Sequence, residues 1–193
     1  MFRIPLLIAI TLAVAFGLGI FSAVSALKAT AGFGSIALGP WQAFPRAQTL
    51  DADPYAKAHR ARAGQLLFGG TEGLSFIAPV DGEGRTLSGT CTYEITGMTP
   101  QARFWTLHAV DTSDNPLATP RELPSAFNAW TTLRAADSRF VIRVSPQAQP
   151  GNWLAVRTGG AFKLVLTLLD TPTAGSSGVL DLSMPDIRRT ECS

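Results

Sequence analysis

The sequence predicts a mainly β protein, an antiparallel β-sandwich preceded by one N-terminal transmembrane helix and one short amphipathic helix. Three observations lead to this prediction. An uncharged apolar segment opens the chain, a single helix start signal follows it, and from there onward short stretches alternate apolar and polar residues between turn signals. Short strands behind a single helix are typical of sandwiches.

The first segment is long enough to cross a membrane. From Ile4 to Leu27 no side chain is charged, and about 20 apolar helical residues span a bilayer core of about 30 Å. A secretory signal has a shorter apolar region, usually about 7 to 15 residues, so the length favours a retained anchor over residues 1–28. Cleavage stays open as the alternative, because small residues at 24–26 precede a candidate cut at Leu27.

The charges beside this segment do not decide its orientation, because Arg3 and the amino terminus face only Lys28 and, further on, Arg46. A three-residue leader is too short for a cytoplasmic domain, and the two cysteines suit an oxidising compartment. We therefore expect a single-pass protein held in the cytoplasmic membrane by Ile4 to Leu27, with the bulk of the chain outside.

The charge of the chain argues against nucleic acid as a partner. The 193 residues have a net charge of +2, and 16% of them are charged. Arg188 and Arg189 form a pair rather than a patch, and the basic residues from Lys57 to Arg62 spread around a helix axis at steps of about 100°. We expect no nucleic-acid binding.

Residues 29–52 are rich in glycine and small side chains, which predicts a linker lying on the domain, with a turn at Gly39-Pro40-Trp41. Asp53 followed by Pro54 is a strong helix start, an N-cap with proline at the first helical position. The predicted helix runs from Pro54 to about Leu67 and ends before a glycine pair. The sandwich domain is predicted over residues 53–193.

The strands follow from two-residue periodicity. The strongest hairpin signal is Asp81-Gly82-Glu83-Gly84, which separates two alternating stretches. The predicted strands are Leu74 to Val80, Thr86 to Thr96, Ala102 to Asp111, Arg139 to Val144, Phe162 to Leu169 and Val179 to Met184.

The only cysteines, Cys91 and Cys192, have no metal-type spacing. In an exported domain they predict one disulfide that fastens the C-terminus to a strand. The polar segment from Asp186 to Glu191 would fray without that bond. Two reduced thiols are the alternative.

Several motifs together resemble a bacterial family, that of domain of unknown function 1214, from about Asp53 to Cys192. The motifs are Asp53-Pro54-Tyr55, Cys91-x-Tyr93-x-Ile95-x-Gly97-x-x-Pro100, residues 102–107, Ala126-Phe127-Asn128, Pro150-Gly151-Asn152-Trp153-Leu154, Leu169-Asp170-Thr171-Pro172 and Pro185-x-Ile187. The membrane-anchored, single-domain type is the most similar. The resemblance implies a jelly-roll-like β-sandwich with an uncharacterised role, and it brings no established catalytic residues. For a bacterial chain, the expected placement outside the cytoplasmic membrane is the periplasm. Ala155 departs from it, since the family often has proline there.

No catalytic or metal motif stands out. The chain lacks a G-x-S-x-G elbow and phosphate-loop patterns, and two isolated histidines have no third ligand at useful spacing. We expect no cofactor and no metal, and we favour a noncatalytic protein over an enzyme. A glycosidase-type carboxylate pair stays a guess, drawn from Glu72, Glu94, Asp111 and Asp137.

The candidate binding residues lie around Asn152 and Trp153. In a structural role, the asparagine amide would form hydrogen bonds with backbone groups of a turn, and the indole would fill the end of the sandwich. The functional alternative is an aromatic pocket for a small polar ligand or glycan formed with Arg103, Trp105 and His108. The leading hypothesis is a noncatalytic, membrane-tethered envelope protein that binds a protein or glycan. The alternative is a periplasmic enzyme or ligand-binding protein using this pocket.

Overall fold

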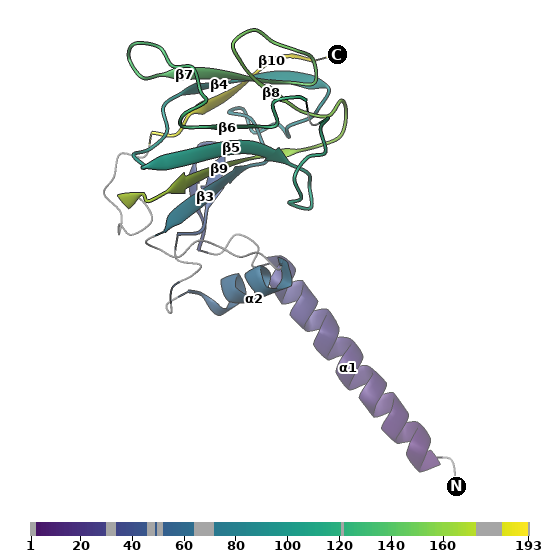
Figure 1. Cartoon of the computed structure of the whole chain (residues 1–193). Helices are drawn as coiled ribbons and strands as arrows, with labels where there is room; N and C mark the ends of the chain where they lie inside the picture. The colour runs from purple at the N-terminus through teal and green to yellow at the C-terminus, as the bar shows by residue number, and fades with distance from the viewer. Residues whose placement is uncertain are drawn as a thin grey trace.

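The computed structural model describes residues 3–29, 34–45, 49, 52–63, 72–120, 122–172 and 183–192. Figure 1 shows the strands stacked as layers, with the helices below them. Among the described residues, six strands form one sheet in the order β1-β2-β3-β9-β5-β6 and four form the other in the order β10-β4-β7-β8. This confirms a mainly β protein with one long apolar helix and one short helix in front of the sheets.

The bounds of the elements follow chain order. They are α1 (Arg3–Ala29), β1 (Ile36–Leu38), β2 (Trp41–Ala43), α2 (Pro54–Ala63), β3 (Gly73–Ala78), β4 (Cys91–Gly97), β5 (Phe104–Val110), β6 (Ala126–Asn128), β7 (Phe140–Ser145), β8 (Asn152–Ala155), β9 (Lys163–Leu169) and β10 (Asp186–Cys192).

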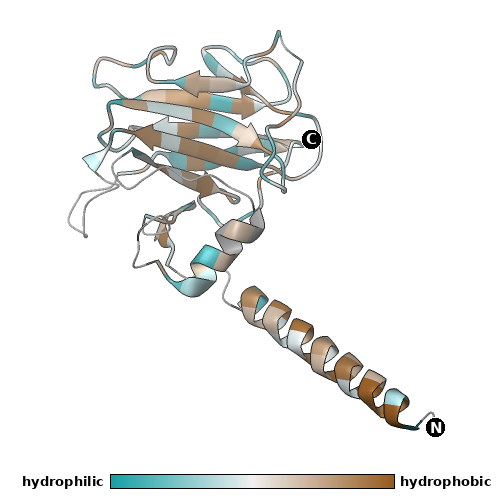
Figure 2. Ribbon diagram, turned by 60° about the horizontal axis from the view of Figure 1, so that its bottom comes forward, coloured by the Kyte–Doolittle hydropathy of each residue, from teal (hydrophilic) through white to brown (hydrophobic). Residues whose placement is uncertain are grey.

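Helix α1 has the length and composition of a membrane span. It covers 27 residues, about 40 Å of helix, and none of its side chains is buried against the rest of the chain. Figure 2 shows it as apolar along nearly its whole length. This length and composition suit a membrane span, and a signal sequence near an N-terminus has the same composition.

Helix α2 begins where the sequence predicts. The Asp53 carboxylate accepts hydrogen bonds from the backbone N–H of Tyr55 (2.8 Å) and Ala56 (3.3 Å), which is an N-cap. The predicted end near Leu67 lies outside the described residues.

The core lies between the sheets and comes from the predicted alternation. One face of each of three central strands is buried: Trp105, Leu107 and Ala109 on β5, Phe140, Ile142 and Val144 on β7, and Leu164, Leu166 and Leu168 on β9. Each fully buried leucine or isoleucine contributes about 1.5–3 kcal/mol relative to its exposure to water. The Trp105 and Phe140 rings pack across the two layers with their centroids 5.5 Å apart.

The predicted hairpin around residues 81–84 is wrong as a strand pair. The turn itself forms, since the Asp81 N–H donates to the Arg85 carbonyl at 2.9 Å. However, β3 pairs with β2 and β9, whereas β4 pairs with β10 and β7 in the opposite sheet. Pairing between the two arms is limited to the Val80–Thr86 bridge and a hydrogen bond from the Leu87 N–H to the Pro79 carbonyl at 3.1 Å, and the Leu87 side chain is fully buried in the core. The chain crosses from one layer to the other here.

Part of the predicted linker belongs to the six-stranded sheet. Strands β1 and β2 pair with each other, and β2 continues onto β3. Trp41 is fully buried, and its indole N–H donates to the Pro185 carbonyl at 2.7 Å. The linker prediction fails over residues 36–43 because three-residue strands are too short to show alternation.

The C-terminal segment forms a strand, which the two-residue periodicity did not predict. Strand β10 pairs antiparallel with β4 over its length and carries a bulge between Arg189 and Glu191. The predicted disulfide is confirmed: Cys91 and Cys192 are bonded, and their Cα atoms are 3.9 Å apart. Of the predicted strand at residues 179–184, residues 179–182 lie outside the described part, and 183 and 184 are not in a strand.

The sheets are not purely antiparallel. After β7 the chain returns through residues 146–151, and β8 then runs parallel to β7 with Ile142 opposite Asn152. The prediction of a fully antiparallel sandwich is therefore wrong for this edge strand. Because β8 runs parallel to β7, Asn152 at the start of β8 lies beside the first half of β7.

Candidate functional site

A loop between β6 and β7 exposes two large apolar side chains. Trp130 is 85% exposed and Leu133 is 70% exposed. Exposed apolar side chains that cluster on a folded domain mark interaction sites more often than single scattered ones do. We use the name Trp130 surface for Phe104, Trp130, Leu133 and Arg134.

Hydrogen bonds from Asn128 fix the first part of this loop. Its side-chain oxygen accepts from the backbone N–H of Trp130 (2.9 Å) and of Thr131 (3.0 Å). The Thr132 hydroxyl donates to the Asn128 carbonyl at 2.8 Å. This is an asparagine turn, and it holds Trp130 outward at the tip.

Asn152 fixes the second part. Its Oδ1 accepts from the Leu133 N–H at 2.8 Å, while its Nδ2 donates to the carbonyls of Leu133 (2.8 Å) and Val141 (2.9 Å). Asn152 is only 7% exposed, and these bonds use both of its amide hydrogens. Its amide therefore clamps the loop to the edge of the four-stranded sheet, which is the structural role considered for it.

Aromatic rings and an arginine support the loop from β5. The Phe104 and Trp130 rings lie 4.8 Å apart. The Arg134 guanidinium lies 5.7 Å from the centroid of the Trp105 ring, within the range of a cation–π contact. Trp105 is 2% exposed, and its indole N–H has no hydrogen-bond partner in the described part of the chain.

The structure gathers some of the predicted binding residues and separates others. Asn152 and Trp105 both support the Trp130 surface, and Arg103 precedes Phe104 and pairs with Asp170 at 3.6 Å. Burial lowers the pKa of His108 below its ordinary value, and this residue points away from the core on β5, on the face opposite Trp105. The Trp153 indole N–H donates to the Ser145 carbonyl at 2.9 Å. A ligand pocket formed by these five residues stays a prediction.

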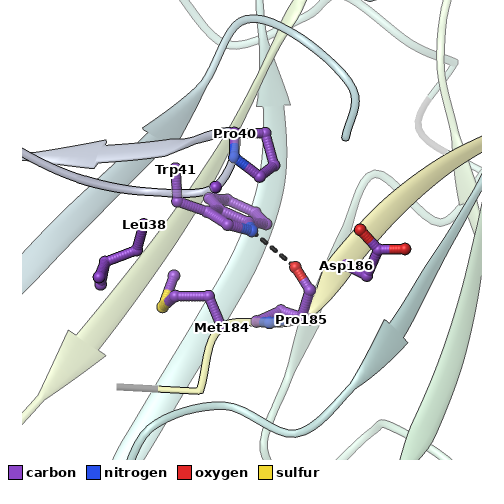
Figure 3. Close-up of a pocket in the computed structure, with 7 residues that line it drawn as sticks. Leu38, Pro40, Trp41, Met184, Pro185 and Asp186 are labelled. Atoms are coloured by element: carbon purple, nitrogen blue, oxygen red, sulfur yellow. Dashed lines mark hydrogen bonds between the residues drawn. The ribbon is translucent and has the colours of Figure 1, made fainter. Parts of the chain in front are cut away.

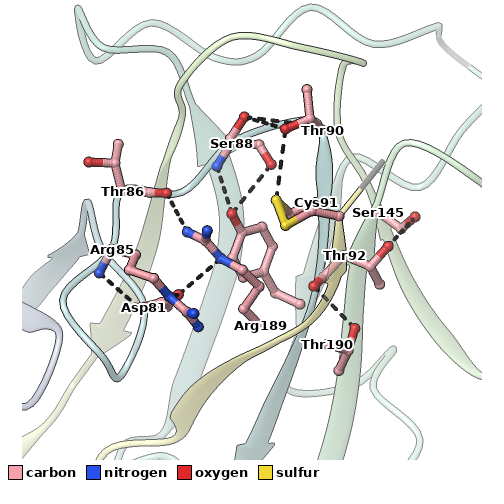
Figure 4. The surroundings of a disulfide bond; sticks show 12 residues. Asp81, Arg85, Thr86, Ser88, Thr90, Cys91, Thr92, Ser145, Arg189 and Thr190 are labelled. Carbon is pink, nitrogen blue, oxygen red and sulfur yellow. Dashed lines mark hydrogen bonds and ion pairs between the residues drawn. A yellow bond between two sulfur atoms is a disulfide. The ribbon is translucent and has the colours of Figure 1, made fainter.

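A buried ion-pair cluster ties the 81–85 turn to β10 beside the disulfide (Figure 4). The Asp81 carboxylate, 1% exposed, lies 3.0 Å from the Arg85 Nε and 3.1 Å from the Arg189 Nε. Burial alone would raise the Asp81 pKa, but hydrogen bonds from the Arg85 and Glu83 backbone and from the Arg85 guanidinium outweigh it and hold the pKa below its usual value. The cluster joins the turn to β10 through paired charges.

A groove lies where the β1–β2 turn meets the start of β10 (Figure 3). It has a volume of about 300 Å³ and is lined by Leu38, Gly39, Pro40, Trp41, Met184, Pro185 and Asp186. Sequence reasoning missed it because one wall was assigned to a linker and the other to a tail.

Three of the four carboxylates considered for a catalytic pair have separate partners. Glu94 pairs with Arg188 at 2.7 Å, whereas the Asp111 and Asp137 side chains accept from the backbone of their own turns, at 2.8 Å from the Ser113 nitrogen and 3.1 Å from the Arg139 nitrogen. Among the described residues, no group of three or more histidine, cysteine, aspartate or glutamate side chains is arranged to hold a metal ion.

The family model described as "Protein of unknown function (DUF1214)" matches residues 72–173, which include the central strands and the whole Trp130 surface. The chain belongs to this family. No curated protein matches the sequence.

One of two similar solved structures shares the fold of this chain. The VPA0106 protein of Vibrio parahaemolyticus is 19% identical with a TM-score of 0.65, over 91% of this chain and 44% of its own. An uncharacterised protein of Burkholderia cenocepacia is 16% identical with a TM-score of 0.44, over 94% of this chain and 52% of its own. The chain thus spans about half the length of these two proteins.

Proposed function

We propose that this DUF1214 protein is a noncatalytic, membrane-tethered binding module whose sandwich lies in the bacterial periplasm and docks an envelope protein on the Trp130 surface. The observation that carries the proposal is an almost fully exposed tryptophan on a loop held rigid from both sides.

The location is supported by the two ends of the chain. Helix α1 is apolar and has no buried side chain, so it suits a bilayer. The Cys91–Cys192 bond belongs to an oxidising compartment, because cytoplasmic thiols are kept reduced.

The choice of a protein partner comes from the composition of the surface. Tryptophan and arginine dominate binding hot spots, and a loop ordered before binding loses little entropy on association. Among the described residues, Arg134 has no ion pair that would compete with a partner's carboxylate. A glycan site needs hydrogen-bonding groups around the ring, but the neighbours of Trp130 include the apolar Phe104 and Leu133. The Asn152 amide, which an enzyme or small-ligand pocket would need, is already used by backbone groups.

The tether predicts membrane retention. We expect the protein to keep its full mass and to stay with the membrane fraction after high-salt and carbonate washing, because about 20 or more apolar residues in helix α1 hold it in the bilayer. Mass spectrometry and fractionation measure this. A soluble periplasmic form that starts near Leu27 would show that the helix is a cleaved signal.

Photocrosslinking tests the binding surface. A photoreactive amino acid in place of Trp130, in the full chain in intact cells, is expected to give a reproducible adduct with one envelope protein. The matched control is the same amino acid at Glu83, whose side chain is 70% exposed on the turn beside the disulfide-linked end of the domain. Leu133→Ser should reduce the adduct several-fold, because a hot-spot neighbour loses its apolar contact. Equal adducts at both positions, or an adduct with glycan alone, would contradict a protein docking site here.

A further inference from the structure

The groove of Figure 3 joins two segments that are far apart in the sequence. The Trp41 indole N–H donates to the Pro185 carbonyl at 2.7 Å, and this bond fastens the β1–β2 turn to the start of β10. Trp41 is fully buried, so it fixes the wall to which it belongs, and its bond to Pro185 holds the two walls together. The groove is therefore a preformed concavity, at the small end of ligand-site volumes, which run from about 300 to 1,000 Å³.

The walls differ in chemistry. Leu38, Pro40, Met184 and the Pro185 ring are apolar, and Asp186 is the one ionisable residue that lines the groove. Within the described residues Asp186 has no ion pair, unlike Asp81, whose carboxylate two arginines neutralise. An exposed carboxylate beside an apolar groove attracts a cation that has an apolar body.

We propose that this groove binds an alkylammonium group, a primary amine on a short apolar chain. The ammonium donates to the Asp186 carboxylate and to the Pro185 carbonyl, which has a second lone pair beyond the one used by Trp41. The alkyl chain lies against Leu38, Pro40 and Met184. This site is separate from the Trp130 surface and does not depend on the proposed docking of a protein.

Two sources can present this chemistry. One is a soluble amine. The other is the amine headgroup of a phospholipid, because β1 begins at Ile36 and α1 ends at Ala29, a connection that spans at most about 25 Å.

The test uses the full chain, labelled with ¹⁵N, in nanodiscs made of lipids without primary amines. The probe is n-butylammonium chloride, and the signals of the Trp41 indole N–H and the Gly39 amide report on the groove. We expect a saturable shift with a millimolar dissociation constant. Asp186→Asn should weaken binding about fivefold, since a charge-assisted hydrogen bond is lost. Glu191→Gln, which neutralises an exposed carboxylate at the other end of β10, is the matched control and should leave the affinity unchanged.

The neutral probe n-butanol separates charge from apolar contact. It should bind the native protein at least about fivefold more weakly than the amine, and Asp186→Asn should not change its affinity. Adding phosphatidylethanolamine to the nanodiscs distinguishes the sources: the same shift without soluble amine assigns the site to the lipid headgroup, and no shift assigns it to soluble amines. Equal binding of butanol and butylammonium, an affinity unchanged by Asp186→Asn, or no saturable shift would overturn the proposal.

Discussion

Replacing Cys192 with serine is expected to lower the free energy of unfolding by about 4 to 5 kcal/mol, because the bond closes a loop of 101 residues in the unfolded chain. For a domain of this size the melting temperature should fall by about 10 °C or more. The fold should survive, because two other contacts hold β10 in place. Ile187 stays buried in the core, and Arg189 stays paired with Asp81. Thermal unfolding of the full chain in detergent, followed by circular dichroism, measures the change.

The matched control for this experiment is Thr190→Val. It removes the hydrogen bond from the Thr190 hydroxyl to the Thr92 carbonyl in the same tail but leaves the disulfide intact, so it should cost about 1 kcal/mol or less. Titration that finds two reactive thiols in protein taken from its native compartment would show that the bond does not form there, and would remove one support for a periplasmic domain.

The elements that the sequence predicts well are those whose own residues determine them. Helix α1 is defined by composition, the start of α2 by Asp53, and the central strands by alternation that their burial matches. The partners of each strand could not be predicted in the same way. A turn such as residues 81–85 specifies its own backbone but not the sheet that each of its two arms joins. The crossing between β3 and β4 depends on tertiary packing around Leu87.

Strand β10 escaped prediction because its inward positions are not all apolar. Ile187 faces the core, but the next inward residue is Arg189, whose guanidinium lies 5.4 Å from the Tyr93 ring centroid. The aliphatic part of an arginine can cover an aromatic ring, and the charge of Arg189 pairs with Asp81. A charged residue type therefore gave no sign that this position faces inward.

The sequence indicated the residues that support the Trp130 surface but not the exposed residues that form it. Asn152 and Trp105 stand out in the sequence, yet they support the site rather than form its exposed surface. Trp130 was missed because a tryptophan in a mainly β sequence suggests the core. The signal that could have found it is Asn128 followed by Thr131, since an asparagine turn at the end of a strand makes the next residues project into solvent.

Replacing Asn152 with alanine is expected to destabilise the protein by about 3 kcal/mol. The change removes the partner of the Leu133 N–H and of the Leu133 and Val141 carbonyls. An unsatisfied group costs about 1–3 kcal/mol when it is buried, and less beside an exposed residue such as Leu133, where water can replace the partner. The loop should loosen as well, so crosslinking from position 130 should fall although residue 152 does not touch a partner. Urea unfolding of the full chain measures the first effect and the intact-cell adduct the second.

Two further substitutions separate a clamp from a ligand-binding amide. Trp153→Phe removes one hydrogen bond, to the Ser145 carbonyl, keeps most of the ring packing and should cost about 1 kcal/mol. Asn152→Asp keeps an acceptor for the Leu133 N–H but sets a carboxylate oxygen against two carbonyls, so it should destabilise at least as much as alanine does. If Asn152 instead served a bound ligand, Asn152→Ala would leave the unfolding midpoint unchanged and alter only binding, because the backbone groups around it would then have other partners.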